Sequence, residues 1–370
     1  MDALTMPSNW QRVRLGDIFF ITAGGDLSKP HYSNTKQSDF NYPIYSNAIE
    51  KKGLYGYSSF FIIKNKSITI TSRGTIGVAF FRDYPYVPIG RLLVLQPKIS
   101  NIDCRFYTEY INSKVKFNTE QTTIPQLTIP KVALCEIPLP PLDEQIAIAN
   151  VLSDVDRYLY ALDALILKKE SVKKALSFEL LSQRKRLKGF NQNWQRVRLG
   201  DILSYEQPTK FLVATTQYLQ KGFTPILTAG KTFILGYTND KHGIYTNIPV
   251  IIFDDFTTDS KMVNFPFKVK SSAIKILSLR DNNQADLKYI YEKLTLLKHQ
   301  VTDHKRYWID EFSNFEILLP PLNEQIAIAN ILSALDNEIA SLKNKKRQFE
   351  NIKKALNHDL MSAKIRVLNK

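Results

Sequence analysis

Apolar residues recur at alternating spacings of three and four through two segments of the chain. The first segment, 143–186, contains neither proline nor glycine, and its stripe consists of Leu152, Val155, Leu159, Leu162 and Ile166. The second stripe consists of Leu332, Leu335, Ile339 and Leu342, then Phe349, Ile352, Leu356 and Leu360. This pattern predicts two long helices that pack through a coiled-coil seam. A helix of about 44 residues spans about 65 Å, which is longer than the core of a small domain requires.

Prolines and short polar side chains indicate where these helices begin. Pro138, Pro140 and Pro141 precede the first segment, and prolines are tolerated before a helix but not inside one. Asp143 and Asn323 stand at matching positions, and both residue types are favoured N-caps. The two helices are therefore predicted to start at these residues.

The chain repeats itself around these helices. The ten residues 9–18 return letter for letter at 193–202, and 140–150 return at 320–330 with one change, Asp143 to Asn323. Aligning 140–182 on 320–362 gives 21 identities in 43 positions. The intervening stretches 19–139 and 203–319 are largely unlike each other. The order predicts a duplicated chain with four parts: a first domain at 1–139, a helix at 140–188, a second domain at 189–319 and a helix at 320–370.

Both inserts carry the signals of mixed α and β structure. The first has β-rich runs at 67–71 and 78–81 around a turn, and a helical piece at 105–116. The second has β-rich runs at 249–253 and 262–269 around a polar loop, and a helical piece at 287–300. A faint echo near Pro43 and Pro225 suggests that both inserts share one fold. The predicted fold class is α+β: two α/β domains joined by two long helices in a pseudo-twofold, circular repeat.

Connectivity and charge both predict that the helices are antiparallel. Only residues 189–193 separate the first helix from the repeated box that opens the second domain, so this helix runs from one domain to the other. The repeat requires the second helix to run back, which brings the tail 365–368 near the box at Trp10. Net charges of −4 for 140–167 and +6 for 168–190, then −3 for 320–342 and +7 for 343–370, place acidic halves beside basic halves.

Bulk composition narrows the classes of function. A net charge of +15 over 370 residues suggests a polyanionic partner. No apolar run of about 18 residues appears, so we expect no membrane-spanning helix and no membrane partner. The only cysteines, Cys104 and Cys135, do not form a disulfide framework, and we expect reduced thiols in a cytoplasmic protein.

Three motifs carry a resemblance to a known family. They are the NWxxVxLGDI opening at 9–18, the entry P-L-P-P-L-x-E-Q-x-x-I-A to the first long helix, and the K-K-A-L stretches at 173–176 and 353–356. Phrases at 71–77, 251–256 and 264–269 add to them. The whole chain resembles the specificity subunit of type I restriction-modification systems. The order box, insert, helix, repeated twice, makes this resemblance specific.

The resemblance implies a function in DNA recognition. Each insert would be a target recognition domain that reads one half of a bipartite sequence in double-stranded DNA. The helices would space the half-sites and dock two modification (methyltransferase) subunits, and restriction subunits would join that core. The resemblance implies no cofactor in this chain: S-adenosylmethionine would bind to the modification subunits, and ATP and Mg to the restriction subunits.

Candidate DNA contacts are polar and basic residues near the predicted turns, because arginine pairs well with guanine and glutamine with adenine. In the first insert we expect them to be Tyr45, Asn47, Lys64, Lys66, Ser72, Arg73 and Gln126. In the second insert we expect them to be Lys231, Lys241, Thr257, Thr258, Lys261, Lys305, Arg306 and Tyr307. Residues 305–307 align with 125–127 in the repeat. Which bases are read depends on loop conformation, which the sequence does not specify.

Signals for catalysis are weak. Asp254 and Asp255 with Lys261 lack the further carboxylates of a nuclease site, and His299, Asp303 and His304 resemble surface residues more than metal ligands. Gly74 and Gly77 do not belong to a G-x-x-x-x-G-K-[ST] phosphate loop, and no methyl-donor loop or N-P-P-[FY] motif is present. We therefore predict no catalytic, cofactor or metal residue. A coiled-coil adaptor that binds no DNA and a remnant of a self-contained nuclease–methyltransferase remain alternatives.

Overall fold

The computed structural model describes residues 7–117, 125–214, 217–229, 232–297 and 306–367. The chain forms two compact units: unit 1 comprises 1–163 with 344–370, and unit 2 comprises 164–343. Each unit therefore contains one insert domain together with one half of each long helix. The predicted sequence boundaries at 139 and 319 separate the inserts from the helices, whereas the packing divides each helix near its middle.

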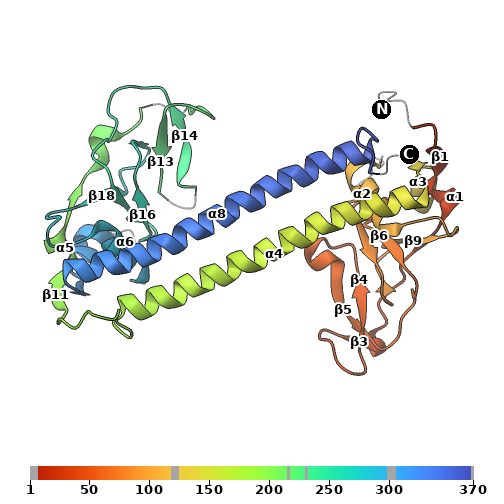
Figure 1. Ribbon diagram of the computed structural model, residues 1–370, viewed down its shortest axis with the longest axis horizontal. Helices are drawn as coiled ribbons and strands as arrows, with labels where there is room; N and C mark the ends of the chain where they lie inside the picture. The colour runs from red at the N-terminus through yellow and green to blue at the C-terminus, as the bar shows by residue number, and fades with distance from the viewer. Residues whose placement is uncertain (1–6, 118–124, 215–216, 230–231, 298–305, 368–370) are drawn as a thin grey trace. The chain divides into compact units, whose positions relative to one another are not determined.

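The two predicted long helices are present as α4 (Leu142–Leu181) and α8 (Leu322–Met361), each of 40 residues. Both are uninterrupted in Figure 1. Each ends earlier than the sequence pattern suggests, in a turn whose second residue is left-handed, Gln183 (φ 61°) or Ala363 (φ 54°). A left-handed residue commonly terminates a helix, and here neither is the glycine that would have signalled it.

The helices begin one residue before the predicted N-caps, so the capping prediction is wrong. Asp143 and Asn323 lie in the first turn, where each side chain accepts a hydrogen bond from the next residue's backbone N–H. Pro141 supplies the start, because its carbonyl accepts from Glu144 N (3.1 Å) and Gln145 N (3.0 Å). Pro141 precedes the first helical residue, and the carbonyl at that position accepts the first bond of the helix.

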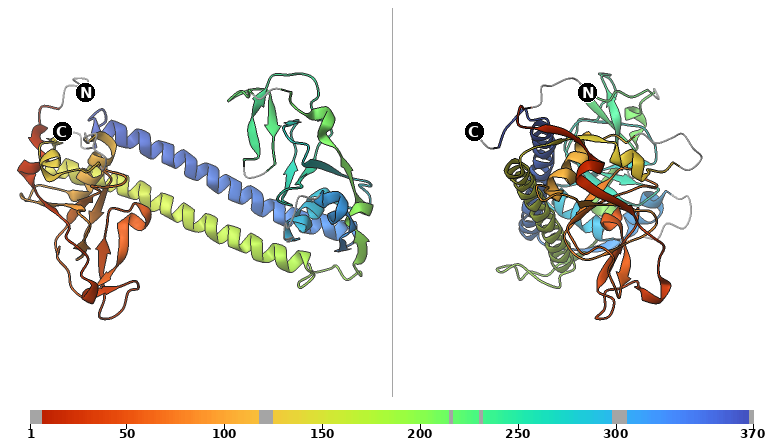
Figure 2. Two further views of the ribbon diagram at one scale, coloured as in Figure 1. Left: turned by 180° about the vertical axis from the view of Figure 1, so that it is seen from behind. Right: turned by 90° about the vertical axis from the view of Figure 1, so that its right-hand side faces the viewer.

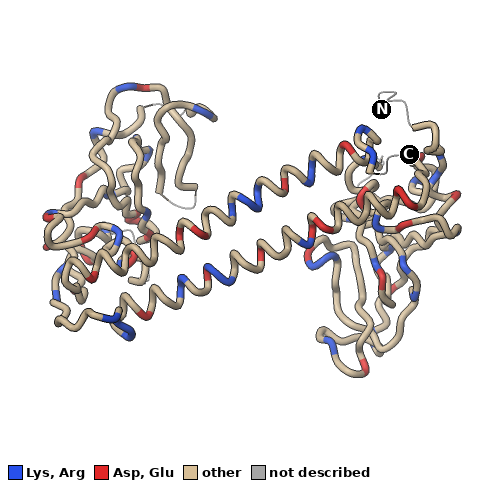
Figure 3. The backbone as a smooth tube through the Cα atoms, in the orientation of Figure 1, with Lys and Arg blue, Asp and Glu red and all other residues tan. Residues whose placement is uncertain are grey.

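Within each unit the helix segments run antiparallel, as predicted. Lys346–Asp163 (2.6 Å) and Lys353–Asp156 (2.7 Å) join them in unit 1. Lys173–Asp336 and Lys343–Glu170, both at 2.6 Å, join them in unit 2. Residue numbers rise on one helix as they fall on the other, and the segments of each unit lie side by side in Figure 2. Both helices carry acidic and basic residues in Figure 3, and these ion pairs join the basic residues of one helix to the acidic residues of the other.

In its described residues, unit 1 contains three sheets and three short helices besides its halves of α4 and α8. The sheets have the orders β1-β10, β2-β9-β6-β7 and β3-β5-β4-β8. The strands are β1 (Gln11–Arg14), β2 (Phe19–Ala23), β3 (Tyr32–Ser33), β4 (Tyr42–Tyr45), β5 (Leu54–Ser58), β6 (Ser67–Ile70), β7 (Ala79–Arg82), β8 (Val87–Pro88), β9 (Leu93–Pro97) and β10 (Glu136–Leu139). The helices are α1 (Leu15–Ile18), α2 (Cys104–Lys114) and α3 (Ile129–Ala133), with 3-10 turns at Lys29–His31 and Glu50–Gly53.

Unit 2 repeats this plan with the orders β11-β19, β12-β18-β15-β16 and β14-β13-β17. Its strands are β11 (Gln195–Arg198), β12 (Leu203–Glu206), β13 (Thr224–Leu227), β14 (Ile234–Thr238), β15 (Val250–Asp254), β16 (Ser260–Val263), β17 (Lys268–Val269), β18 (Ile274–Leu279) and β19 (Glu316–Leu319). Its helices are α5 (Leu199–Ile202), α6 (Leu287–Leu296) and α7 (Tyr307–Asp310), with 3-10 turns at Pro208–Phe211 and Phe312–Asn314. Apart from β3, each strand of unit 1 has a counterpart in the same order in unit 2, so the two unlike inserts share one fold.

One predicted strand, 262–269, is divided. β16 pairs with β15 in the larger sheet, whereas β17 pairs in parallel with β13 in the other sheet. Pro266 stands between them, and proline cannot donate a hydrogen bond to a strand ladder. The break lets one stretch of chain contribute to two sheets.

The repeated boxes form the joint between each insert and its helices. In unit 1 a single core contains Trp10, Tyr107 of α2, Leu152 of α4 and Leu360 of α8. Ala149 also belongs to this core, and Leu356 packs against it. The core of unit 2 contains Trp194, Tyr289 of α6, Leu180 of α4 and Leu332 of α8. Half of each long helix is therefore built into the core of a unit.

A buried glutamate organises each joint. Glu144 accepts from Trp10 Nε1 (2.9 Å) and from both Nε (2.5 Å) and Nη2 (2.9 Å) of Arg366. In unit 2, Glu324 accepts from Trp194 Nε1 (3.1 Å) and from Nε (3.1 Å) and Nη2 (2.6 Å) of Arg186. The chain after each helix thus returns to a repeated box, as predicted for the tail at 365–368; residue 368 itself lies outside the described residues.

Replacing Arg366 with methionine is expected to destabilise unit 1. The Glu144 side chain is 3% exposed and Arg366 is 34% exposed, so the change leaves a buried carboxylate with a single indole donor. Removing one partner of a buried pair costs about 3–5 kcal/mol, and partial exposure of the arginine lowers our expectation to about 2 kcal/mol. Urea unfolding of the full chain measures it. Arg12→Met, which breaks the exposed Arg12–Glu136 pair, is the control. Equal destabilisation by both changes would contradict this interpretation.

Candidate nucleic-acid interface

Three loops of unit 1 meet beside the end of β6, in the sheet β2-β9-β6-β7. Ser72 lies in the loop between β6 and β7. It donates from its backbone N to Asn47 Oδ1 (2.7 Å) and from its Oγ to the carbonyl of Arg91 (2.7 Å). Asn47 in turn donates to the carbonyl of Gly90 (2.6 Å). These bonds fix the loops that carry residues 46–53, 71–78 and 89–92 against one another. The resulting surface is rigid, as a site for recognition requires.

The β6–β7 loop also holds its own shape. Thr71 Oγ1 donates to the carbonyl of Thr75 (2.5 Å) and accepts from Val78 N (2.9 Å). Gly77 adopts a φ of +89°, and a Cβ there would stand 2.9 Å from the ring of Phe117. The loop is therefore closed on itself, and the exposed Arg73 projects from a fixed backbone.

Arg73 and Gln126, predicted separately, lie together. Arg73 Nη2 donates to Gln126 Oε1 at 3.2 Å, and Leu127 N donates to the carbonyl of Ser72 at 2.9 Å. An arginine and a glutamine side by side offer donors and acceptors of the kind that read base edges in the major groove. This pair is the strongest feature of the candidate interface.

Three other predicted residues of unit 1 have structural tasks here. Tyr45 is 6% exposed and Ser72 is fully buried, so neither side chain is available to a base without rearrangement. The amide of Asn47 is occupied by the Ser72 and Gly90 contacts. Tyr45 instead lies under the buried guanidinium of Arg82, at 3.6 Å, and its pKa is raised mainly by burial. In this structure the three side chains hold the loops together, and their contact with DNA stays a prediction.

Lys64 and Lys66 are exposed but lie elsewhere. They precede β6, whereas Arg73 follows it, so a strand of four residues separates them by roughly 13 Å. Sequence reasoning missed Arg91, which is exposed and left-handed (φ 67°), and the exposed left-handed pair Lys51 and Lys52. Both groups are on the loops joined by Ser72 and Asn47. A basic residue beside glycine, in Gly90-Arg91 and Lys52-Gly53, was the available signal.

The equivalent loop of unit 2, between β15 and β16, is held by aspartates. Asp254 accepts from Phe256 N and from Thr257 Oγ1, both at 2.8 Å. Asp255 accepts from Trp308 N (3.0 Å) and pairs with Lys275 at 2.8 Å, where both charged side chains are buried. The Trp308 bond places the loop beside the segment around Arg306, as Leu127 does beside Ser72. The two units thus build corresponding surfaces from different side chains.

The predicted residues of unit 2 divide in the same way. Thr257 and Arg306 are exposed, and Thr258 and Lys261 are partly exposed, on or beside the β15–β16 loop. Tyr307 is 1% exposed and belongs to the core, and its contact with DNA stays a prediction. Lys241 is exposed and lies in the segment between β14 and β15, not on the β15–β16 loop. Lys231 and Lys305 lie outside the described residues.

The weak signals for catalysis find structural explanations where they are described. Asp254 caps its own loop and Asp255 neutralises Lys275, so this pair is engaged in folding. Within the described ranges, no cluster of three or more His, Cys, Asp or Glu side chains has the arrangement of a metal site. His299, Asp303 and His304 lie outside those ranges. None of the described helices is both long enough and apolar enough to cross a membrane.

Comparison with known proteins agrees with this architecture. The family model described as "Type I restriction modification DNA specificity domain" matches twice, at 7–170 and 191–351. The specificity subunit of the Escherichia coli type I restriction enzyme EcoR124I/EcoR124II is 46% identical over 180 residues, which span 45% of this chain and 44% of that relative. The MjaVIII specificity subunit of Methanocaldococcus jannaschii is 24% identical over 100% of this chain and 96% of its own length.

A solved structure shares the fold. The S subunit of a type I restriction-modification system from M. genitalium gives a TM-score of 0.69 at 18% identity, covering 96% of this chain and 98% of that one. The two family matches together span far more than half of the chain, and they coincide with the two repeats. The chain therefore belongs to the family of type I restriction modification DNA specificity domains, of which it carries two copies.

Proposed function

We propose that this chain is the DNA-recognition subunit of a type I restriction-modification complex. Each insert domain reads one half of a bipartite target, so we call them recognition domain 1 (in unit 1) and recognition domain 2 (in unit 2). The observation that carries the proposal is one fold used twice with different loops. In unit 1 the β6–β7 loop presents Arg73 beside Gln126 of the segment before α3. In unit 2 the β15–β16 loop presents Thr257, and the segment before α7 presents Arg306. Two different readers on equivalent frames suit a target with two unlike halves.

The proposal extends to partners and cofactors. The chain supplies recognition and no catalysis, and two modification subunits that bind S-adenosylmethionine dock on its helices. Restriction subunits, with ATP and Mg, complete the complex. The net charge of +15 supports a DNA partner, because lysine and arginine contacts to phosphate supply most of the sequence-independent affinity.

Two experiments test the proposal. Methylome sequencing of cells with and without the gene should show one bipartite motif that is methylated only when the chain is present. The complex purified through the tagged full chain should bind DNA containing that motif. The logarithm of its binding constant should fall linearly with the logarithm of the salt concentration. A complex that binds no DNA at low salt would support the adaptor alternative instead. Methylation by the purified chain alone would support the self-contained enzyme.

Replacing Arg73 with alanine is expected to relax recognition at one position of one half-site. A bidentate side chain contributes about 1–3 kcal/mol of discrimination against a wrong base, so preference at that position should fall by roughly tenfold. The half-site read by recognition domain 2 should stay unchanged. Binding selection from a randomised library, or the methylome of the variant, measures both halves at once.

The control is Arg12→Ala, which removes an exposed arginine from β1, away from the three loops. It should leave both half-sites as they are. Relaxed preference in the half-site of recognition domain 2, or an unaltered motif in the Arg73→Ala variant, would refute the assignment of the β6–β7 loop to base reading.

A further inference from the structure

One lysine in each unit joins three elements that are distant in sequence. In unit 1, Lys353 Nζ on α8 lies 2.7 Å from Asp156 on α4 and 3.7 Å from Glu109 on α2. Glu109 also accepts from the amide of Asn357 at 2.9 Å. We call Lys353, Asp156 and Glu109 clamp 1. Its lysine connects the helix of the recognition domain to both long helices.

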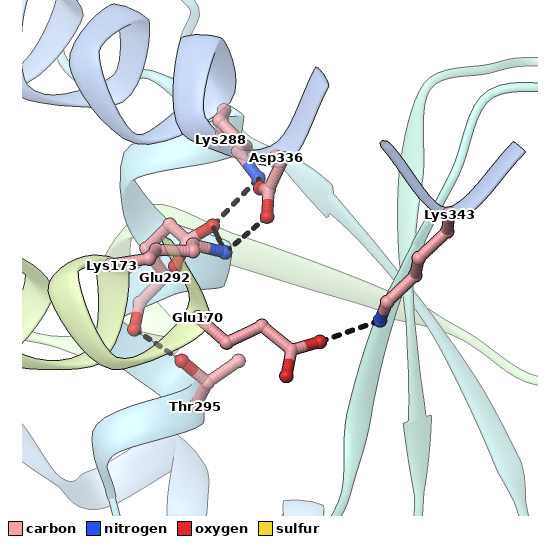
Figure 4. Close-up of polar contacts among 7 residues, drawn as sticks. All are labelled: Glu170, Lys173, Lys288, Glu292, Thr295, Asp336 and Lys343. Carbon is pink, nitrogen blue, oxygen red and sulfur yellow. Dashed lines mark hydrogen bonds and ion pairs between the residues drawn. The ribbon is translucent and has the colours of Figure 1, made fainter. Parts of the chain in front are cut away.

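Unit 2 repeats the arrangement with exchanged helices. Lys173 Nζ on α4 lies 2.6 Å from Asp336 on α8 and 3.2 Å from Glu292 on α6. We call this group clamp 2, and Figure 4 shows the two carboxylates converging on Lys173. A second cation, Lys288 on α6, also contacts Glu292 (2.6 Å) and Asp336 (2.8 Å). The corresponding residue of unit 1, Arg105, instead pairs with Asp103 and contacts Asn150.

Both units contain the clamp although their inserts differ in sequence. Lys173 and Lys353 belong to the repeated helices, but Glu292 and Glu109 belong to the unlike inserts. Each glutamate stands six residues after an aspartate that caps its helix, Asp286 or Asp103. The same glutamate at the same place in two otherwise different helices indicates a shared task beyond filling the core.

A second repeated contact holds the start of α2 in unit 1 and of α6 in unit 2. Gln145 Oε1 accepts from Asp103 N, and Gln325 Oε1 accepts from Asp286 N, both at 2.9 Å. Both glutamines are fully buried. Each of these two helices is thus held at its N-terminus by the glutamine and farther along by the clamp. Two points of attachment determine a direction, which apolar packing alone does not, because hydrophobic contact is non-directional.

Electrostatics make each clamp sensitive to its lysine. Without Lys353, the carboxylates of Glu109 and Asp156 would face each other as like charges. Burial raises the pKa of Glu109, and Asp156 adds to that effect, while Lys353 opposes it. In clamp 2, burial also disfavours the charge on Asp336, but hydrogen bonds from Lys173 and Lys288 outweigh it and lower the pKa of Asp336. Clamp 2 has two lysines around its two carboxylates, whereas clamp 1 has one.

We propose that Lys353 and Lys173 are positioning residues that set the angle of each recognition domain on the helix pair, and thereby restrict the number of base pairs allowed between the two half-sites. The inference rests on the proposed function. Neither lysine contacts DNA in this role. Lys353 acts through Glu109 of α2, and Lys173 acts through Glu292 of α6. Because clamp 2 has a second cation, recognition domain 1 depends more on a single lysine.

The test uses the complex purified through the tagged full chain and a DNA library in which the two half-sites are separated by every spacing around the natural one. The wild-type complex should select one spacing. Lys353→Met should raise the share of bound DNA with one more or one fewer base pair by about fivefold, the effect of losing a partly exposed ion pair. Lys173→Met should have a smaller effect, and Lys173→Met with Lys288→Met should match Lys353→Met.

The chain offers close controls. Lys354 and Lys174 are exposed neighbours of the two clamp lysines, and Lys354→Met and Lys174→Met should leave the spacing profile unchanged. Lys353→Arg should restore a narrow profile. Asp156→Asn changes only the outer carboxylate, so it tests clamp 1 if Lys353→Met fails to fold. Adding Glu109→Gln to Lys353→Met should not broaden the profile further, because both changes break one unit.

The outcomes separate the two proposals. A wild-type complex that selects no bipartite site contradicts the proposed function. A wild-type complex that selects one spacing, together with Lys353→Met and Asp156→Asn variants that keep it, overturns the clamp. Broadening by Lys354→Met equal to that by Lys353→Met would also overturn it, because general loss of charge would then explain the effect.

Discussion

Replacing residues 19–139 with the corresponding insert of a relative that reads a different half-site should change one half of the methylated sequence completely and leave the other half unchanged. The structural reason is that the boundaries of the exchange fall between elements of the frame. Position 18 ends α1, and 139 ends β10, which pairs with β1 of the repeated box. The exchanged insert thus enters a frame that both domains already share.

The exchange must preserve the contacts that the frame makes with the insert. The incoming insert needs a helix in the place of α2 whose first backbone N–H reaches Gln145. It also needs a glutamate at the position of Glu109, for Lys353. An insert with its glutamate changed to glutamine is the matched comparison: it should read the same new half-site but tolerate more spacings. Methylome sequencing provides both readouts. If both half-sites change, the two domains do not read independently.

Lengthening both helices by one heptad at matched positions should widen the gap between the half-sites by about three base pairs. Seven residues add about 10 Å to a helix and keep its seam in phase. The ion pairs locate the insertion points: after Asp163 in α4 and after Lys345 in α8. These points keep Lys346 with Asp163 in unit 1 and Lys343 with Glu170 in unit 2.

Rotation along the duplex will oppose this change. Three base pairs turn the far half-site by roughly 100° at about 10.5 base pairs per turn, so affinity should fall even where the new spacing is selected. The control inserts the same seven residues into α4 alone, which breaks the register with α8 and should abolish selective binding. If the doubly lengthened chain folds and still methylates the original spacing, helix length does not determine the gap.

Residue patterns predicted the frame well because they reflect local physics. The spacing of Leu152, Leu159 and Ile166 required a helix, and connectivity with charge required the two helices to run in opposite directions. The helix ends were less predictable. Gln183 and Ala363 adopt the left-handed conformation without being glycine, and Pro141 starts its helix in place of the expected Asp143. Termini depend on a few backbone bonds that many residues can make.

The candidate interface was predicted in part. Arg73 and Gln126 were both named, but only the fold brings them to 3.2 Å, because 53 residues separate them in sequence. Tyr45, Ser72 and Tyr307 have the right chemistry for DNA and are buried instead. A polar or aromatic side chain near a turn can face either the core or the solvent, and the packing of the neighbouring loops determines which.

The sequence by itself determined the duplication, the two long antiparallel helices and the family, since repeats and periodicity are properties of residue order. The tertiary structure decided which loops meet, which polar side chains are exposed, and that Lys173 and Lys353 each hold a glutamate of an unlike insert. The physical reason is that these contacts join segments 119 and 244 residues apart. Their geometry is fixed by packing around the repeated tryptophan and glutamate joints, which no local pattern specifies.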